Sequence, residues 1–302
     1  MPGLLSPVLP APVVPGDVVA VVAPSSPVPD GELWRGLAWL RMRYRLRLLP
    51  SILSRDGYLA GDDDRRRAEL AGAMLDDEVK AIVAARGGYG AMRIVKDLPW
   101  AHFARRPKWI VGFSDVTALH GMAWRTGVAS VHGPNVSTLG RGISPAVRLA
   151  WLTAIEGLST ARAWRGLRVV HGGEAKGVLV GGNLALLHAM AAAGLLELPV
   201  GAVLAIEDVS EAPYRVDRML TSLLLGGHLA RVSAVVVGGF EGCAPRADGR
   251  TVDAVIADRT RALGVPVVAG APFGHGPHNE AFILGARAAV RGDELTLYPP
   301  GA

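Results

Sequence analysis

Short apolar runs alternate with amphipathic stretches through the first half of the chain. Residues 17–23 read DVVAVVA, a β-branched run before PSSP that is typical of a buried parallel strand. Further strands are expected at 81–85 and 109–113, and helices at 30–46, 64–75, from residue 91 and over 116–125. Strands that alternate with helices predict a parallel α/β layer, and ligands bind such layers beyond the carboxyl ends of the strands.

The second half returns to this alternation after a weaker stretch between Ser144 and Ala175. In that stretch we expect a helix over 145–156 and a polar strand over 163–170. Beyond it, strands are expected at 177–180, 202–207, 234–238 and 267–269, and helices at 184–193, 214–225 and 252–263. The alternating residues 288–297 predict a hairpin that turns at Gly292 and Asp293.

These patterns predict an α/β protein of two domains. We expect a proline-rich tail over 1–16, an N-terminal parallel α/β domain over 17–150, a linker region over 151–175 and a C-terminal α/β domain over 176–302. A chain of 302 residues is long enough for two modest cores.

Charge and cysteine content narrow the classes of function. The net charge is +5, but the arginine clusters are brief and no aromatic residues interleave with them, so we expect no nucleic-acid partner. The single cysteine excludes an internal disulfide and fits a reducing compartment. The start of the chain lacks the features of a signal peptide, and no run approaches the roughly 20 apolar residues of a membrane span. We therefore expect a cytoplasmic protein without a membrane partner.

Ser114 lies in the sequence GFSD at 112–115, between a predicted strand and a predicted helix. A serine at such a turn projects its hydroxyl above the sheet, with backbone N–H groups around it. Val116 occupies the position where the common nucleophile elbow has its second glycine. The motif alone also fits a helix N-cap, because Ser and Asp are both good caps.

A glycine-rich turn, RGGYG at 86–90, follows the neighbouring predicted strand. Glycines let the backbone approach a ligand and expose N–H groups, which suits a phosphate or an oxyanion. The turn matches neither the dinucleotide fingerprint nor the P-loop, so nucleotide binding is the weaker interpretation. A tight turn without a ligand is the remaining alternative.

A carboxylate and a histidine stand at strand ends in the second half. Glu207 ends an apolar strand, where it is suited to orient a histidine, although it or Asp208 could instead cap the following helix. His275 follows Gly274 on a loop and is suited to act as a general base.

A metal site and a cysteine nucleophile are the alternatives to this pair. A zinc site would need ligands such as His132 and His278 beside His275, but the usual zinc motifs are absent, so we expect no metal. Cys243 is the rival nucleophile; no base stands beside it, and a small buried residue is the simpler interpretation.

In their order along the chain, these motifs resemble the LD-carboxypeptidase family. The similarity extends from about residue 17 to 297. The motifs are LAGD at 59–62, RGGYGAMR at 86–93, GFSDVT at 112–117, GGNL at 181–184, ED at 207–208 followed by PYRVDR at 213–218, and GH at 274–275 followed by Asn279. His278 is a departure, because the family commonly has proline directly before this asparagine, and it could be mistaken for the base.

The resemblance implies a serine peptidase with its active site in a cleft between two domains. The N-terminal domain would be flavodoxin-like or glutamine-amidotransferase-like. The implied triad is Ser114 as nucleophile, His275 as base and Glu207 as its orienting carboxylate. The backbone N–H groups of Gly88 and Asp115 are the candidates for the oxyanion hole, with Gly87 as the alternative to Gly88. Substrate contacts are expected from Arg86, Tyr89 and Asn183.

The same resemblance implies the substrate and the assembly. We expect removal of terminal D-Ala from a cytoplasmic murein tetrapeptide, as in peptidoglycan recycling, by a homodimer without metal or organic cofactor. The RGGYG sequence is similar to the murein branch of the family rather than to the microcin-C-immunity branch. A peptidase acting on peptidyl or aminoacyl adenylates and a non-catalytic muropeptide-binding protein remain the alternatives.

Overall fold

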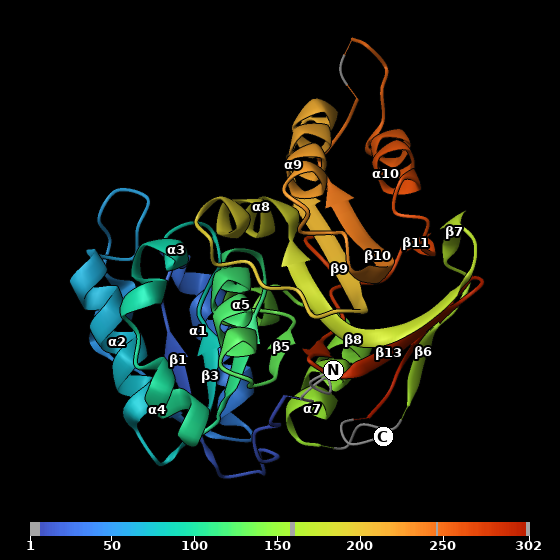
Figure 1. Cartoon of the computed structure of the whole chain (residues 1–302). Helices are drawn as coiled ribbons and strands as arrows, with labels where there is room; N and C mark the ends of the chain where they lie inside the picture. Colours follow the sequence, from blue (N-terminus) through green and yellow to red (C-terminus); the bar gives the residue numbers. More distant parts are fainter. Residues whose placement is uncertain (1–6, 158–160, 246, 300–302) are drawn as a thin grey trace. The chain divides into compact units, whose positions relative to one another are not determined.

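Two sheets organise the chain. The computed structural model describes residues 7–157, 161–245 and 247–299 (Figure 1). Contacts divide these residues into a first unit, 7–157 with Glu280–Ile283, and a second unit, 161–279 with 284–299. Residues 7–16, predicted as a tail, belong to the first unit, where Val8 bridges to Val128 and Val13 is buried.

The first unit contains a six-stranded sheet in the order β12-β5-β4-β3-β1-β2. The strands are β1 (Val18–Val22), β2 (Arg45–Arg47), β3 (Val79–Ala84), β4 (Trp109–Gly112), β5 (Ser130–His132) and β12 (Phe282–Leu284). Each pairing from β2 through β5 is parallel, which confirms the predicted parallel layer. The carboxyl ends of β1, β3 and β4 therefore meet at one edge of the sheet.

Helices cover both faces of this sheet. In Figure 1, α4 and α5 lie in front of the strands, and α1 lies behind them. Helix α1 packs against α6. The helices are α1 (Asp30–Arg41), α2 (Asp63–Leu75), α3 (Ala91–Ile94), α4 (Trp100–Arg105), α5 (Thr117–Arg125), α6 (Val136–Leu139) and α7 (Pro145–Ile155), with 3-10 turns η1 (Pro50–Leu53), η2 (Val95–Asp97) and η3 (Ser114–Val116). Asp62 caps α2 by accepting the N–H of Arg65, as the run of aspartates predicts.

The predicted helix over 30–46 is too long. Helix α1 ends at Arg41, and residues 45–47 form the edge strand β2 against β1. Leu46 stands between two arginines, so this segment also has the alternation of a half-buried strand. Pairing with β1 decided between the two patterns.

The second unit is built on an eight-stranded sheet in the order β6-β14-β13-β8-β9-β10-β11-β7. Its strands are β6 (Arg162–Trp164), β7 (Arg168–His171), β8 (Glu174–Asn183), β9 (Ala202–Val209), β10 (Val232–Glu241), β11 (Val267–Ala269), β13 (Arg287–Arg291) and β14 (Glu294–Leu297). The pairings from β8 through β11 are parallel, and β13 and β14 form the predicted hairpin. The single strand predicted over 163–170 is wrong, because β6 and β7 lie at opposite edges of this sheet.

Three helices pack on the parallel strands of the second unit. They are α8 (Leu184–Ala192), α9 (Pro213–Leu225) and α10 (Val252–Arg261). Their apolar faces form one buried cluster with the sheet, exemplified by Leu187, Val216 and Ile256 against Leu204 and Val235. This core holds the strand ends that carry the candidate residues of this unit.

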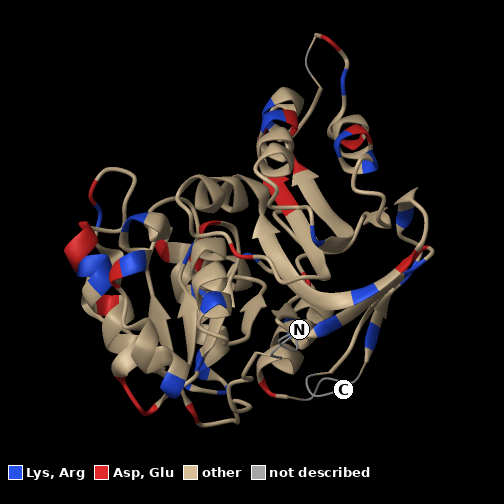
Figure 2. Cartoon of the chain, in the orientation of Figure 1, with Lys and Arg blue, Asp and Glu red and all other residues tan. Residues whose placement is uncertain are grey.

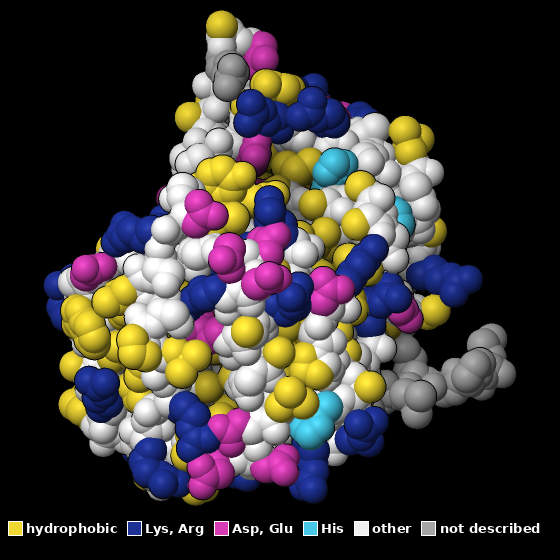
Figure 3. Space-filling view, turned by 90° about the vertical axis from the view of Figure 1, so that its left-hand side faces the viewer, with side chains coloured by type: hydrophobic (Ala, Val, Ile, Leu, Met, Phe, Trp, Pro, Cys, Tyr) yellow, Lys and Arg dark blue, Asp and Glu magenta, His cyan; other side chains and the backbone are white. Residues whose placement is uncertain are grey.

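The surface and the helix lengths give two further observations. On the face drawn in Figure 3, Lys and Arg side chains lie among Asp and Glu side chains. Across the described parts of the chain, every helix is too short or too polar to cross a bilayer.

Candidate active site

Ser114 occupies a strained turn at the end of β4. Its φ is +64°, a conformation that side-chain-bearing residues rarely adopt, and it opens the 3-10 turn η3. The preceding N–H, from Phe113, donates to Asn135 Oδ1 at 3.3 Å. The serine is half-buried, as expected of a nucleophile elbow that presents its hydroxyl at a sheet edge.

Gly87 lies directly against this serine. A Cβ on Gly87 would lie 2.8 Å from Ser114 Cβ and 3.1 Å from Ser114 Oγ. A Cβ on Gly88, whose φ is +106°, would instead meet Ser26 Oγ at 2.4 Å. Gly87 therefore faces Ser114, whereas Gly88 faces Ser26. Gly87 is the residue predicted as the alternative to Gly88 in the oxyanion hole.

The other residues of this turn are held by the loop that follows β1. Arg86 donates from Nη1 to the carbonyl of Pro27 at 2.7 Å, and the N–H of Tyr89 donates to Ser26 Oγ at 3.1 Å. The Tyr89 ring is 49% exposed and stands edge-on to Tyr58, with centroids 5.6 Å apart. Tyr89 is thus accessible to a ligand, whereas the guanidinium of Arg86 is partly engaged by the backbone.

Asp115 is buried beside the nucleophile. Its Oδ2 accepts the hydroxyl of Ser25 at 2.6 Å and the N–H of Ala91 at 2.7 Å. Burial raises the pKa of Asp115, and these hydrogen bonds oppose the rise. The side chain therefore links the loop after β1 to the helix that follows the glycine-rich turn.

In the second unit, Glu207 and His275 are in contact. Glu207 lies near the carboxyl end of β9, where it is 0% exposed, and its Oε2 lies 2.7 Å from His275 Nδ1. Gly274, with φ +118°, brings the histidine loop close to Glu207, and its N–H donates to Asn279 Oδ1 at 3.3 Å. The carboxylate therefore requires the proton on Nδ1, and Nε2 is the nitrogen that can act as a base.

Asp208, which the sequence analysis treated as a possible cap, does cap a helix, but the preceding one. Its Oδ2 accepts the N–H of Ala185 at the start of α8, and its Oδ1 accepts Nδ2 of Asn183 at 3.0 Å. Burial raises the pKa of Asp208 to about 6, and nearby Glu207 adds to the rise. The end of β9 is acidic in Figure 2. The sequence analysis did not predict that the Asp208 carboxylate contacts Asn183 beside Glu207.

Asn183 is 3% exposed, and its own Oδ1 caps α8 by accepting the N–H of Leu186. It pairs with Glu207 in the register between β8 and β9. These contacts hold Asn183 beside the end of β9, next to Glu207, and its predicted contact with the substrate stays a prediction.

His120 is a further buried group that the sequence analysis missed. Its Nε2 lies 2.9 Å from the carbonyl of Gly112, and its Nδ1 lies 3.0 Å from Ser130 Oγ. Because a carbonyl only accepts, Nε2 carries the proton. Burial lowers the pKa of His120 to about 4, so the ring is neutral and supports the strand that leads to Ser114. A lone histidine in a helix gave no signal of this role.

The rival chemistries find little support. Cys243 is 7% exposed, and its sulfur accepts the N–H of Glu211 at 3.2 Å. Burial raises the pKa of its thiol, which disfavours the reactive thiolate. His278 is exposed on its loop, and the described residues contain no cluster of three His, Cys, Asp or Glu side chains placed to hold a metal ion.

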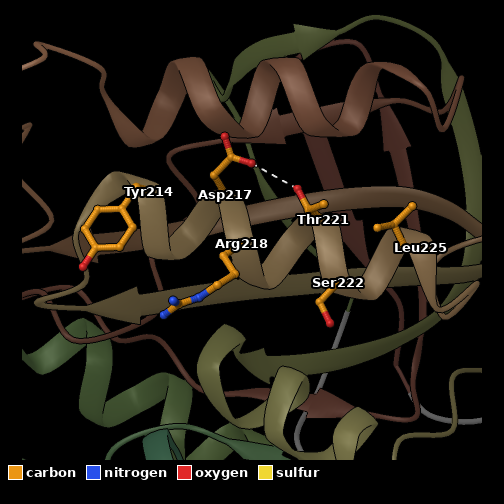
Figure 4. Close-up of a pocket in the computed structure, with 6 residues that line it drawn as sticks. All are labelled: Tyr214, Asp217, Arg218, Thr221, Ser222 and Leu225. Carbon is orange, nitrogen blue, oxygen red and sulfur yellow. Dashed lines mark hydrogen bonds between the residues drawn. The ribbon is translucent and has the colours of Figure 1, made fainter.

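A hollow of about 570 Å³ runs along α9. Figure 4 shows that Arg218 and Ser222 point to the same side of this helix and that Thr221 hydrogen-bonds to Asp217. The lining residues are Tyr214, Asp217, Arg218, Thr221, Ser222 and Leu225. The hollow contains none of the predicted triad residues.

Comparison with known families agrees with the division of the chain into two units. Residues 19–133 match the model of the LD-carboxypeptidase N-terminal domain, and residues 176–290 match that of the C-terminal domain. The chain belongs to the LD-carboxypeptidase family. It is therefore a carboxypeptidase with a two-domain α/β fold, as the motifs predicted.

Relatives of this LD-carboxypeptidase cover nearly its whole length. The murein tetrapeptide carboxypeptidase of Pseudomonas aeruginosa is 33% identical over 291 residues, which is 92% of this chain and 94% of the relative. The crystal structure of muramoyltetrapeptide carboxypeptidase from Oxalobacter formigenes is 30% identical, with a TM-score of 0.83 over 93% of this chain and 99% of that one. The microcin C7 self immunity protein MccF shares the fold, with a TM-score of 0.88 over 97% of this chain and 98% of its own at 21% identity.

Proposed function

We propose that this LD-carboxypeptidase uses Ser114, His275 and Glu207 to remove the terminal D-Ala from murein tetrapeptides. The hydrogen bond between Glu207 and His275 is the observation that carries the proposal, because it assigns the base and its tautomer. The positive φ of Ser114 and the approach of Gly87 support its role as the nucleophile.

The reaction is an acyl transfer in two steps. As Ser114 Oγ attacks the carbonyl carbon before D-Ala, His275 Nε2 takes the hydroxyl proton. The tetrahedral intermediate then collapses, the C–N bond breaks, and His275 returns the proton to the amine of D-Ala. In the second step His275 takes a proton from water, the hydroxide attacks the acyl-enzyme, and Ser114 recovers its proton.

Glu207 stabilises the imidazolium that forms in each step. Its carboxylate is buried and held at 2.7 Å from Nδ1, so its attraction for the charged ring is little screened. Backbone N–H groups at Gly87 or Gly88 and at Asp115 are proposed to bind the oxyanion. Each such donor typically contributes about 3 kcal/mol.

The substrate is proposed from the relatives. The Pseudomonas enzyme is named for murein tetrapeptides, and the Oxalobacter enzyme for muramoyltetrapeptides. A role in peptidoglycan recycling is proposed from the same names. The cytoplasmic location and the homodimer are proposed from the family resemblance of the motifs alone.

The deciding experiment is mass spectrometry of L-Ala-D-Glu-meso-diaminopimelate-D-Ala incubated with the purified protein. We expect loss of one alanine with the wild type and none with Ser114→Ala or His275→Asn. Full activity of Ser114→Ala would overturn the nucleophile assignment. An intact tetrapeptide with folded wild type would overturn the substrate, and a peptidyl adenylate offered in parallel would then test the microcin-C-type alternative.

A further inference from the structure

A buried arginine in the first unit binds three loops at once. Arg66, on α2, is 0% exposed. Its Nη1 donates to the carbonyls of Pro24 at 2.6 Å and Gly90 at 2.8 Å, and its Nε donates to the carbonyl of Gly61 at 3.3 Å. Its Nη2 pairs with Asp63. A fully buried guanidinium is costly unless it is paired, and here much of its pairing is with loop backbone.

The buried Asp115 binds the residues that follow two of those loop positions. In the loop after β1, Arg66 donates to the carbonyl of Pro24, and Asp115 accepts the hydroxyl of the next residue, Ser25. In the glycine-rich turn, Arg66 donates to the carbonyl of Gly90, and Asp115 accepts the N–H of the next residue, Ala91. Two opposite charges thus hold the same two loops through successive residues. The positive charge of Arg66 also opposes the rise that burial causes in the pKa of Asp115.

Both loops act on the nucleophile. The loop after β1 contacts the glycine-rich turn again, since the N–H of Ser26 donates to the carbonyl of Gly87 at 3.2 Å. Gly87 in turn lies against Ser114, next to Asp115 in the sequence. Movement of either loop would therefore displace the turn relative to Ser114.

We propose that Arg66 and Asp115 are positioning residues that hold the glycine-rich turn, residues 86–90, in register with the nucleophile. Neither side chain needs to touch the substrate, and both act through backbone atoms. The inference rests on the proposed role of Ser114. Replacing both partners of a buried ion pair by apolar residues is often neutral, so the presence of such charges is weak evidence that they serve stability alone. Removing one partner by itself is destabilising, and the test must therefore separate stability from kcat.

The first test replaces Arg66 by methionine and compares it with a matched buried cation. Lys108 is 3% exposed, donates to the carbonyls of Val79 (3.2 Å) and Asp76, and lies at the opposite, amino-terminal edge of the same sheet. We expect Arg66→Met to lower kcat by about 10²-fold with KM nearly unchanged, because a displacement near 1 Å costs about that much. Lys108→Met should lose a comparable amount of thermal stability and keep its kcat. Equal kcat in the two variants at equal loss of stability would overturn the proposal.

The second test separates the acceptor from the charge at Asp115. Both hydrogen bonds described above use Oδ2 of Asp115, and Oδ1 has no hydrogen-bond partner among the described residues. Asparagine can therefore preserve the contacts of Oδ2. We expect Asp115→Ala to lower kcat by about 10²-fold and Asp115→Asn to restore most of it. A double variant with Arg66→Met should lose little more than either single variant, because both hold the same loops. Additive losses of kcat in the double variant would refute the positioning role. An inactive Asp115→Asn beside an active Asp115→Ala would refute it as well.

A peptide boronic acid, with boron in place of the scissile carbonyl, supplies the readout of geometry. It forms a tetrahedral serine adduct, so its affinity should fall with kcat in Arg66→Met, while the affinity for the tripeptide product should not. Ser114→Ala is run alongside. If that variant is active, the proposed function fails; if it is inactive and Arg66→Met binds the boronate like the wild type, only the positioning proposal fails.

Discussion

Replacing Gly87 by alanine tests the approach of the glycine-rich turn to Ser114. The added methyl would lie 2.8 Å from Ser114 Cβ and 3.2 Å from the carbonyl oxygen of Phe113. Carbon atoms normally approach to about 3.5–4.0 Å, so turn and serine must separate by roughly 1 Å. A misplacement of this size costs about 10²-fold in rate, and we expect that loss in kcat for D-Ala release.

The backbone itself does not oppose this substitution. Gly87 lies outside the left-handed region, so alanine can adopt its conformation, and overpacking should cost about 1–3 kcal/mol. Gly72→Ala is the matched control, because Gly72 is exposed on α2 with no atom within 4 Å of the added methyl. The control should gain about 0.5–1 kcal/mol and keep its activity. Steady-state kinetics and thermal unfolding measure both; a folded Gly87→Ala variant with wild-type kcat would refute the proposed geometry.

Three further predictions concern the second unit. Glu207→Gln should lower kcat by about 10³–10⁴-fold in the tetrapeptide assay, because an amide can place the His275 proton on Nε2; activity within tenfold of wild type would contradict this tautomer. Burial raises the pKa of Asp208 from 3.8 to about 6, so the folded state holds this proton more tightly than the unfolded state. The contribution of Asp208 to the free energy of unfolding is therefore greatest below pH 4 and falls by about 3 kcal/mol as the pH rises through 6. Asp208→Asn should flatten this fall, as measured by urea unfolding at several pH values. The same pH dependence in the variant and the wild type would refute the raised pKa. Cys243→Ala should retain full activity, and an inactive but folded variant would return the thiol as a candidate nucleophile.

Most strands and helices could be predicted because their signals are local. The β-branched run at β1 and the aspartate run at the start of α2 indicate their elements within a few residues. Chemistry at strand ends was equally readable, since Ser114 and Glu207 follow apolar runs. Parallel pairing then brings the carboxyl ends of neighbouring strands to one edge.

Errors arose where a segment fitted two patterns. Residues 45–47 continue a helical pattern as well as a strand pattern, and only their pairing with β1 makes them β2. Residues 162–171 form two strands rather than one, because their partners, β14 and β11, lie on opposite sides of the sheet. No periodicity within such short segments contains this information.

The sequence by itself determined the order of the elements, their caps and the family motifs that name Ser114, Glu207 and His275. The tertiary structure decided which buried polar groups support them. Arg66 reaches the carbonyl of Pro24 across 42 residues, and Asp115 reaches Ser25 across 90. Hydrogen-bond partners so far apart depend on how strands and loops stack, and no local preference encodes that distance.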